Sequence, residues 1–78
     1  MRKRQTVNRL KEYYDFLSTA SQRELRDRMM EMLNLSTASF YRRLENPTLF
    51  SISDKLSIAT IAGMPPHFLF PELENVNS

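Results

Sequence analysis

Apolar residues recur at helical spacing through most of the chain. The first apolar stripe has spacings of three, four and three residues and consists of Val7, Leu10, Tyr14 and Leu17. This spacing places the side chains on one face of a helix, which Tyr13 and Phe16 widen. We expect the first helix over residues 7–19, with Thr6 as its N-cap.

A second helix is predicted from about residue 22 to Leu33. Its start is indicated by Ser21 and Glu24, which are three residues apart and match a capping box: the serine hydroxyl and the glutamate side chain each satisfy a free backbone amide. The apolar face of this helix consists of Leu25, Met29, Met32 and Leu33.

A tight turn and a third helix follow directly. Asn34 tolerates the left-handed backbone conformation that ends a helix abruptly. Ser36 is a favourable N-cap for a helix over Thr37–Glu45, which Asn46-Pro47 stops. The chain therefore predicts helix, three-residue turn and helix over about 22–45.

The remaining apolar residues predict a fourth helix and a short fifth. Ser51 and Asp54 cap the fourth helix, and Gly63 ends it. Its expected inner face consists of Ile52, Leu56, Ala59 and Ala62. A short helical turn follows over 67–70, and the polar tail 72–78 is expected to fray.

The predicted fold is therefore all-α, with four helices and a short fifth in one domain over 6–71 and a flexible basic arm over 1–5. The expected core consists of Leu10, Tyr14, Leu17, Leu25, Met29, Leu33, Phe40, Leu44, Leu56, Ala59 and Leu69. The remaining aromatic and methionine positions, Phe16, Met32 and Met64, are also expected in the core.

Composition excludes several kinds of chemistry. The 78 residues include no cysteine, so disulfides, thiolate metal ligands and thiol catalysis are excluded. The single histidine, His67, builds no metal site alone, and no set of nucleophile, base and orienting group is present. We expect no catalytic residue, no cofactor, no metal and no small-molecule substrate. No apolar run suits a membrane span or a secretory signal, so we expect a cytoplasmic protein.

Charge is distributed unevenly. Residues 1–45 carry ten Lys/Arg against six Asp/Glu, whereas residues 46–78 carry one Lys against three Asp/Glu. A basic first half favours an anionic partner such as nucleic acid, and the alternative is ordinary surface scatter. The third helix offers short polar and basic side chains with no acid before Glu45: Thr37, Ala38, Ser39, Tyr41, Arg42 and Arg43.

The segment LNLSTASFYRRLENP at 33–47 resembles the lambda-repressor-like (Cro and XRE type) helix-turn-helix proteins, in the small versions carried by phages, plasmids and conjugative elements. The segments 50–56, 58–64 and 68–70 resemble the fourth helix and closing turn of that family, so the resemblance covers about 21–71. Three features depart from the family pattern: Asn34 in place of glycine, Met30 in place of a small residue, and the earlier opening of the second helix.

The resemblance implies sequence-specific binding of double-stranded DNA by a homodimer on a two-fold operator. It implies a small transcriptional regulator, a repressor of a mobile element, which lies with the nucleoid in the bacterial cytoplasm. By position, the residues facing base edges are Thr37, Ala38, Tyr41 and Arg42. Those reaching phosphates are Arg23, Arg26, Ser36, Ser39 and Arg43. We expect the dimer to form through the fourth or fifth helix.

Other interpretations remain open from the sequence. The chain is alternatively a helical protein-interaction module, antitoxin-like or an adaptor, that reads no bases. RNA binding is disfavoured because no aromatic platform for stacked bases is evident. The side chain of Tyr41 either faces a base or packs sideways on the bundle, and Arg2, Lys3 and Arg4 either follow DNA or are simply solvated.

Overall fold

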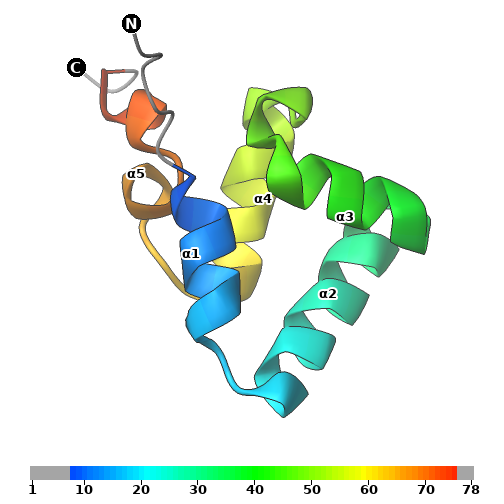
Figure 1. Ribbon diagram of the computed structural model, residues 1–78. Coiled ribbons are helices and arrows are strands. Elements are labelled where there is room, and N and C mark those ends of the chain that lie inside the picture. Colours follow the sequence, from blue (N-terminus) through cyan, green and yellow to red (C-terminus); the bar gives the residue numbers. More distant parts are fainter. Residues whose placement is uncertain (1–7, 76–78) are drawn as a thin grey trace, which may run out of the picture.

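The computed structural model describes residues 8–75, and over this range the structure is all-α, as predicted (Figure 1). The arm at 1–5, Thr6 and Val7 lie outside the described residues, as do residues 76–78. The elements are α1 (Arg9–Phe16), α2 (Thr19–Leu33), α3 (Thr37–Glu45), the 3-10 helix η1 (Pro47–Leu49), α4 (Ile52–Ala62), α5 (Pro66–Leu69) and the 3-10 helix η2 (Pro71–Asn75).

The predicted boundaries of α3 and α4 are confirmed, because local capping signals determine them. The Ser36 hydroxyl accepts a hydrogen bond from the Ser39 amide at 3.1 Å, and the Ser51 hydroxyl accepts one from the Asp54 amide at 3.1 Å. Gly63 ends α4 with a φ of 71°, a left-handed conformation that glycine adopts without a steric penalty.

The predicted turn between α2 and α3 is also confirmed. Asn34 has a φ of 57° and is the sole residue other than glycine with a positive φ within 8–75. The Leu35 amide then donates to the Met30 carbonyl at 2.9 Å, which closes the end of α2. The two helices consequently meet through a hydrogen-bonded turn of three residues.

We predict that Asn34→Ala lowers the free energy of unfolding by about 1 kcal/mol, because alanine tolerates the left-handed conformation less well than asparagine. Asn34→Gly, the matched control, is expected to stay within about 0.5 kcal/mol of the parent. Urea denaturation followed by circular dichroism measures both. Equal stability of the alanine and glycine variants would show that this backbone conformation is not held.

The predicted start of α2 is wrong. Ser18, rather than Ser21, is the N-cap: its hydroxyl accepts from the Ser21 amide at 3.2 Å, and α2 begins at Thr19. Leu17 is extended, so α1 ends at Phe16 instead of residue 19. The Gln22 side-chain amide donates to the Tyr14 carbonyl at 2.8 Å and satisfies the end of α1 from within α2.

Asn8 begins α1 and also contacts α3. Its side-chain oxygen accepts from the Lys11 amide at 3.0 Å, which makes Asn8, not Thr6, the N-cap of α1. Its side-chain nitrogen donates to the Leu44 carbonyl at 3.0 Å and to the Glu45 carbonyl at 3.4 Å. One side chain therefore satisfies the first turn of α1 and the last turn of α3.

The core lies where all five α-helices meet. The expected residues found buried are Leu10, Tyr14, Leu25, Met29, Phe40, Leu44, Ala59 and Leu69. Leu17, Leu33 and Met64 are partly buried against them. Four further side chains outside the predicted core are also buried: Phe50, Ile58, Phe70 and Leu73.

Four apolar side chains predicted to face inward are exposed: Phe16 on α1, Met32 on α2, and Ile52 and Leu56 on α4. Leu56 is 46% exposed, because α4 is rotated so that Lys55, Ile58 and Ala59 face the core. Phe16 is 86% exposed and Met32 is 60% exposed. Phe16 is the last residue of α1, and it is the following residue, Leu17, that packs partly against the core.

An ion pair holds the segment after α5 against α4. The Lys55 ammonium lies 2.6 Å from the Glu72 carboxylate and 5.7 Å from the centroid of the Phe70 ring. The expectation of a frayed tail from residue 72 is therefore wrong for 72–75, which form η2 and contribute the buried Leu73. The polar sequence of this segment did not indicate its attachment to α4, because the contact joins residues that are 17 positions apart.

We predict that this ion pair makes stability fall in acid. Burial raises the pKa of Glu72, but the hydrogen bond from Lys55 and a backbone hydrogen bond outweigh burial, so the pKa lies below its ordinary value of 4.5. A lowered pKa stabilises the fold above that value, and the contribution disappears as pH falls through the folded pKa. Glu72→Gln is expected to lower the free energy of unfolding at neutral pH, because it removes the charge that faces Lys55. The loss is expected to be only about 1 kcal/mol, because solvent screens the half-exposed carboxylate. Urea titrations at several pH values check this, and a difference that persists in strong acid would contradict it.

Candidate nucleic-acid interface

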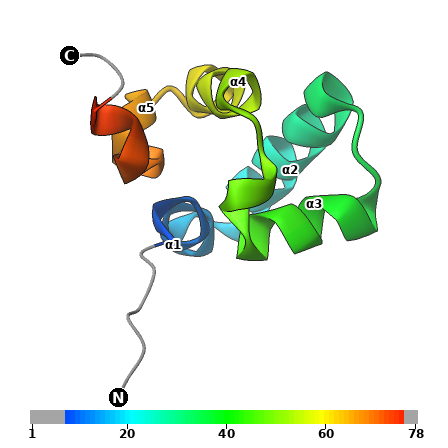
Figure 2. The ribbon, with the colours of Figure 1, turned by 90° about the horizontal axis from the view of Figure 1, so that it is seen from above.

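The helix α3 lies along one edge of the molecule, at the end opposite to α5 (Figure 2). Its rotation is set by Phe40 and Leu44, which are four residues apart and buried. The ring of Phe40 packs edge-on against Tyr14 of α1, with the two centroids 5.7 Å apart. The opposite face of α3 is consequently turned to solvent.

The exposed face of α3 carries the side chains predicted to reach base edges. Thr37, Ala38, Tyr41 and Arg42 are all exposed. Within residues 8–75 the guanidinium of Arg42 forms no ion pair, and neither does that of Arg23 on α2. Arg42 is therefore available to an external acceptor.

Tyr41 is linked to α2. Its phenol oxygen accepts from the Arg26 guanidinium at 3.4 Å, and its ring packs edge-on against Phe40 with the centroids 5.0 Å apart. The hydrogen bond from Arg26 lowers the pKa of the Tyr41 phenol, and the same bond raises the pKa of Arg26. Tyr41 remains 41% exposed, so the side chain that contacts α2 through Arg26 still presents part of its surface to solvent.

The five residues predicted to contact DNA phosphates differ in their contacts within the protein. Arg26 also lies 3.3 Å from the Asp27 carboxylate, which offsets part of its charge. Arg43 donates to the Leu49 carbonyl at 3.0 Å, and its guanidinium carbon is 5.7 Å from the centroid of the Phe50 ring, so it braces the connection to α4. Ser36 is exposed and caps α3, Ser39 is half-buried in its first turn, and Arg23 is exposed.

Within α3 the one acidic residue is Glu45, at its end, and the nearby Asp27 of α2 is paired with Arg26. Glu45, at the end of α3, lies 3.6 Å from the Lys11 ammonium, which also pairs with Asp15 at 3.0 Å. The hydrogen bond from Lys11 to Asp15 is the main reason that the pKa of Lys11 is raised. The exposed first two turns of α3 are thus free of negative charge, which suits an anionic partner.

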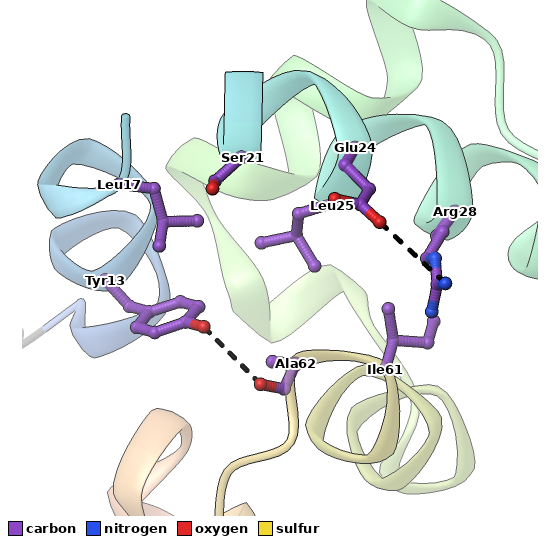
Figure 3. Close-up of a pocket in the computed structure, with 8 residues that line it drawn as sticks. All are labelled: Tyr13, Leu17, Ser21, Glu24, Leu25, Arg28, Ile61 and Ala62. Atoms are coloured by element: carbon purple, nitrogen blue, oxygen red, sulfur yellow. Dashed lines mark hydrogen bonds and ion pairs between the residues drawn. The ribbon is translucent and has the colours of Figure 1, made fainter. Parts of the chain in front are cut away.

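A concave region lies among α1, α2 and α4 (Figure 3). The cavity has a volume of about 230 Å³, and its wall includes the Glu24–Arg28 ion pair at 3.9 Å and the Tyr13 hydroxyl, which donates to the Ala62 carbonyl at 3.4 Å. Across residues 8–75, no group of three metal-ligating side chains was found. No described helix is long and apolar enough to cross a bilayer.

Exposed apolar side chains also lie away from α3, and most of them were predicted to be buried. Phe16 and Phe68 are exposed on α1 and α5, and Ile52 and Leu56 are exposed on α4. Helical spacing alone does not distinguish such positions from core positions, because both continue an apolar stripe. Comparison with known proteins found no matching family model, no matching curated protein and no matching solved structure.

Proposed function

We propose that this protein binds double-stranded DNA sequence-specifically and acts as a small transcriptional regulator, a repressor of a mobile genetic element. The observation that carries the proposal is the pair α2 and α3, joined by the left-handed Asn34, with an acid-free polar face on α3. This arrangement has the features of a helix-turn-helix, in which the second helix enters the major groove. It supports the resemblance to the lambda-repressor-like proteins.

In the proposed complex, α3 lies in the major groove. Arg42 donates two hydrogen bonds to a guanine edge, and the methyl groups of Thr37 and Ala38 meet thymine methyls. Tyr41 contributes its exposed edge beside them. The first turn of α3 presents backbone amides to a phosphate, and the residues that fix the register through the backbone are Arg23, Arg26, Ser36, Ser39 and Arg43.

Two copies on a two-fold operator would double this small contact surface, and the bound dimer would block RNA polymerase. Such a protein acts in the bacterial cytoplasm, where it lies with the nucleoid. Arg43 is expected to contribute least of the phosphate residues, because it must give up its contacts with Leu49 and Phe50.

The proposal is tested by selection from a pool of random duplex DNA at near-physiological salt, followed by sequencing of the retained molecules. We expect an enriched motif with two-fold symmetry. Weak retention that falls steeply with salt and enriches no motif would contradict the proposal, because that behaviour requires only a basic surface.

A protein-interaction module is the second candidate, and the groove between α2 and α4 favours it. Met32 is 60% exposed and lies beside the half-buried Ile61, with Arg28 and Glu31 at the edge. Apolar side chains flanked by charges suit an amphipathic helix of another protein. A partner whose binding is insensitive to salt and is lost in Met32→Glu, with no DNA affinity, would support this candidate.

A further inference from the structure

The cavity among α1, α2 and α4 has a wall that combines apolar side chains with two opposite charges (Figure 3). The apolar part comes from Leu25 of α2, which is buried, and from the half-buried Leu17 and Ile61. The charges are the Glu24 carboxylate and the Arg28 guanidinium. Apolar hollows that carry a few polar groups at defined places are typical of small-molecule sites.

Glu24 and Arg28 are only loosely paired. A guanidinium nitrogen of Arg28 lies 3.9 Å from a carboxylate oxygen of Glu24, which exceeds the length of a hydrogen bond, and both side chains are more than half exposed. The guanidinium therefore keeps its donors, and the carboxylate keeps its acceptors, for a ligand at the edge of the cavity. An exposed pair of this kind adds little to the stability of the fold, so a ligand can separate the two charges without disturbing the helices.

The charges of the wall match those of a zwitterion. Within this wall Glu24 is the one anion and Arg28 the one cation, so a ligand with a single charge would leave one of them without a partner. An α-amino acid carries its ammonium and its carboxylate on the same carbon atom. Glu24 and Arg28 are likewise neighbours, one turn apart on the same face of α2. The planar guanidinium can donate two hydrogen bonds to the ligand carboxylate, while Glu24 accepts from the ammonium.

We propose that this cavity binds a free aliphatic α-amino acid, with its charged head on Glu24 and Arg28 and its side chain on the apolar wall. Figure 3 shows Tyr13 and Leu17 at the end of the cavity away from Arg28, which is where the ligand side chain extends. Burial of an aliphatic side chain there is favourable. The volume of about 230 Å³ is below the range of about 300–1,000 Å³ that drug-sized ligands occupy, so it suits a single amino acid.

Ligands that lack one charge test the recognition of the head. The full chain, without DNA, is titrated with L-leucine, L-isoleucine and L-valine while its backbone amides are followed by NMR. We expect the tightest of the three to bind with a dissociation constant of about 1 mM or lower and to shift amides of residues in the cavity wall. The corresponding amine lacks the carboxylate and the corresponding fatty acid lacks the ammonium. Each is expected to bind about 10-fold more weakly or worse.

Arg28→Gln and Glu24→Gln are each expected to weaken amino-acid binding by about 10-fold or more. Arg9→Gln is the matched control, because Arg9 also forms a loose, exposed ion pair, 4.0 Å from Glu12 on α1, but lies outside this wall. It is expected to leave the binding unchanged. The proposal is overturned if none of the three amino acids binds at about 10 mM, if the amine or the fatty acid binds as tightly, if Arg28→Gln keeps its affinity, or if Arg9→Gln loses it. Circular dichroism verifies that each variant is folded.

This site goes beyond the proposed function, because the titration requires no DNA and the cavity includes no residue of α3. A protein that binds an amino acid by these rules but selects no DNA motif would keep the site and lose only the DNA-binding proposal. A protein that selects a motif but binds none of the three amino acids would do the reverse.

Discussion

Phe40→Ala is expected to leave most of the protein unfolded at room temperature. Phe40 is fully buried, and its ring joins α3 to Tyr14 of α1. Truncating a buried phenylalanine to alanine typically costs about 3–5 kcal/mol, the sum of lost burial and the cavity left behind. A domain of this length is stable by a comparable amount, since small cores rarely supply more. Urea denaturation followed by circular dichroism measures the loss directly.

Phe16→Ala is the matched control, because it makes the same chemical change at a side chain that is 86% exposed. Its effect on the free energy of unfolding is expected to stay within about 0.5 kcal/mol. The measurement belongs at low protein concentration, where association does not add to stability. If the two variants were equally stable, the side of α3 assigned to the core would be incorrect.

Arg42→Ala is expected to weaken binding to the selected DNA motif by about 1–3 kcal/mol and to relax the preference at one base position. The physical reason is that Arg42 is exposed and unpaired within the described residues, so its guanidinium is free to meet a guanine edge. Fluorescence anisotropy with the motif and with single-base variants of it measures both effects. An equal loss on every sequence would instead make Arg42 a phosphate contact.

Arg28→Ala removes the same charge from a different place. Arg28 lies on the side of α2 that faces Ile61 of α4, and it pairs with Glu24 at 3.9 Å. We expect this variant to select the same motif as the parent, with a small uniform change in affinity. If Arg28→Ala altered the motif and Arg42→Ala did not, the exposed face of α3 would not be the reading surface.

The turn and α3 were predictable because their signals are local. Asn34, Ser36 and the Asn46-Pro47 pair each act on the backbone within a few residues, so the sequence determines where α2 ends and where α3 begins and ends. The start of α2 was not predictable in this way. Ser18 and Ser21 both suit an N-cap, and the choice depends on where α1 ends.

The orientation of α4 required information from a distant part of the chain. The spacing of Ile52 and Leu56 indicated an apolar face, but a lysine occupies the inner position. Lys55 is buried because Glu72 neutralises it and Phe70 covers it, and both partners lie beyond α4 in the sequence. Helical periodicity alone therefore does not predict that a paired lysine occupies the buried face of α4.

The candidate site was also predictable only in part. The polar side chains on the outer face of α3 follow from helical spacing once the core side is known. The engagement of Arg26 with Tyr41 and of Arg43 with Leu49 does not follow, because each bond depends on how two elements pack. The structure therefore ranks the basic residues by availability, which the sequence alone left equal.

The double role of Asn8 limits how long α3 is allowed to be. The Asn8 side chain caps α1 through its oxygen and donates from its nitrogen to the last carbonyls of α3. Adding one turn to α3 would carry those carbonyls about 5 Å past the Asn8 nitrogen. An inserted turn would fray both helices at once, and amide hydrogen exchange would quicken at residues 9–11 as well as at the new terminus. Variation in the outer face of α3 is thus confined to the identities of its side chains, within a helix of nine residues.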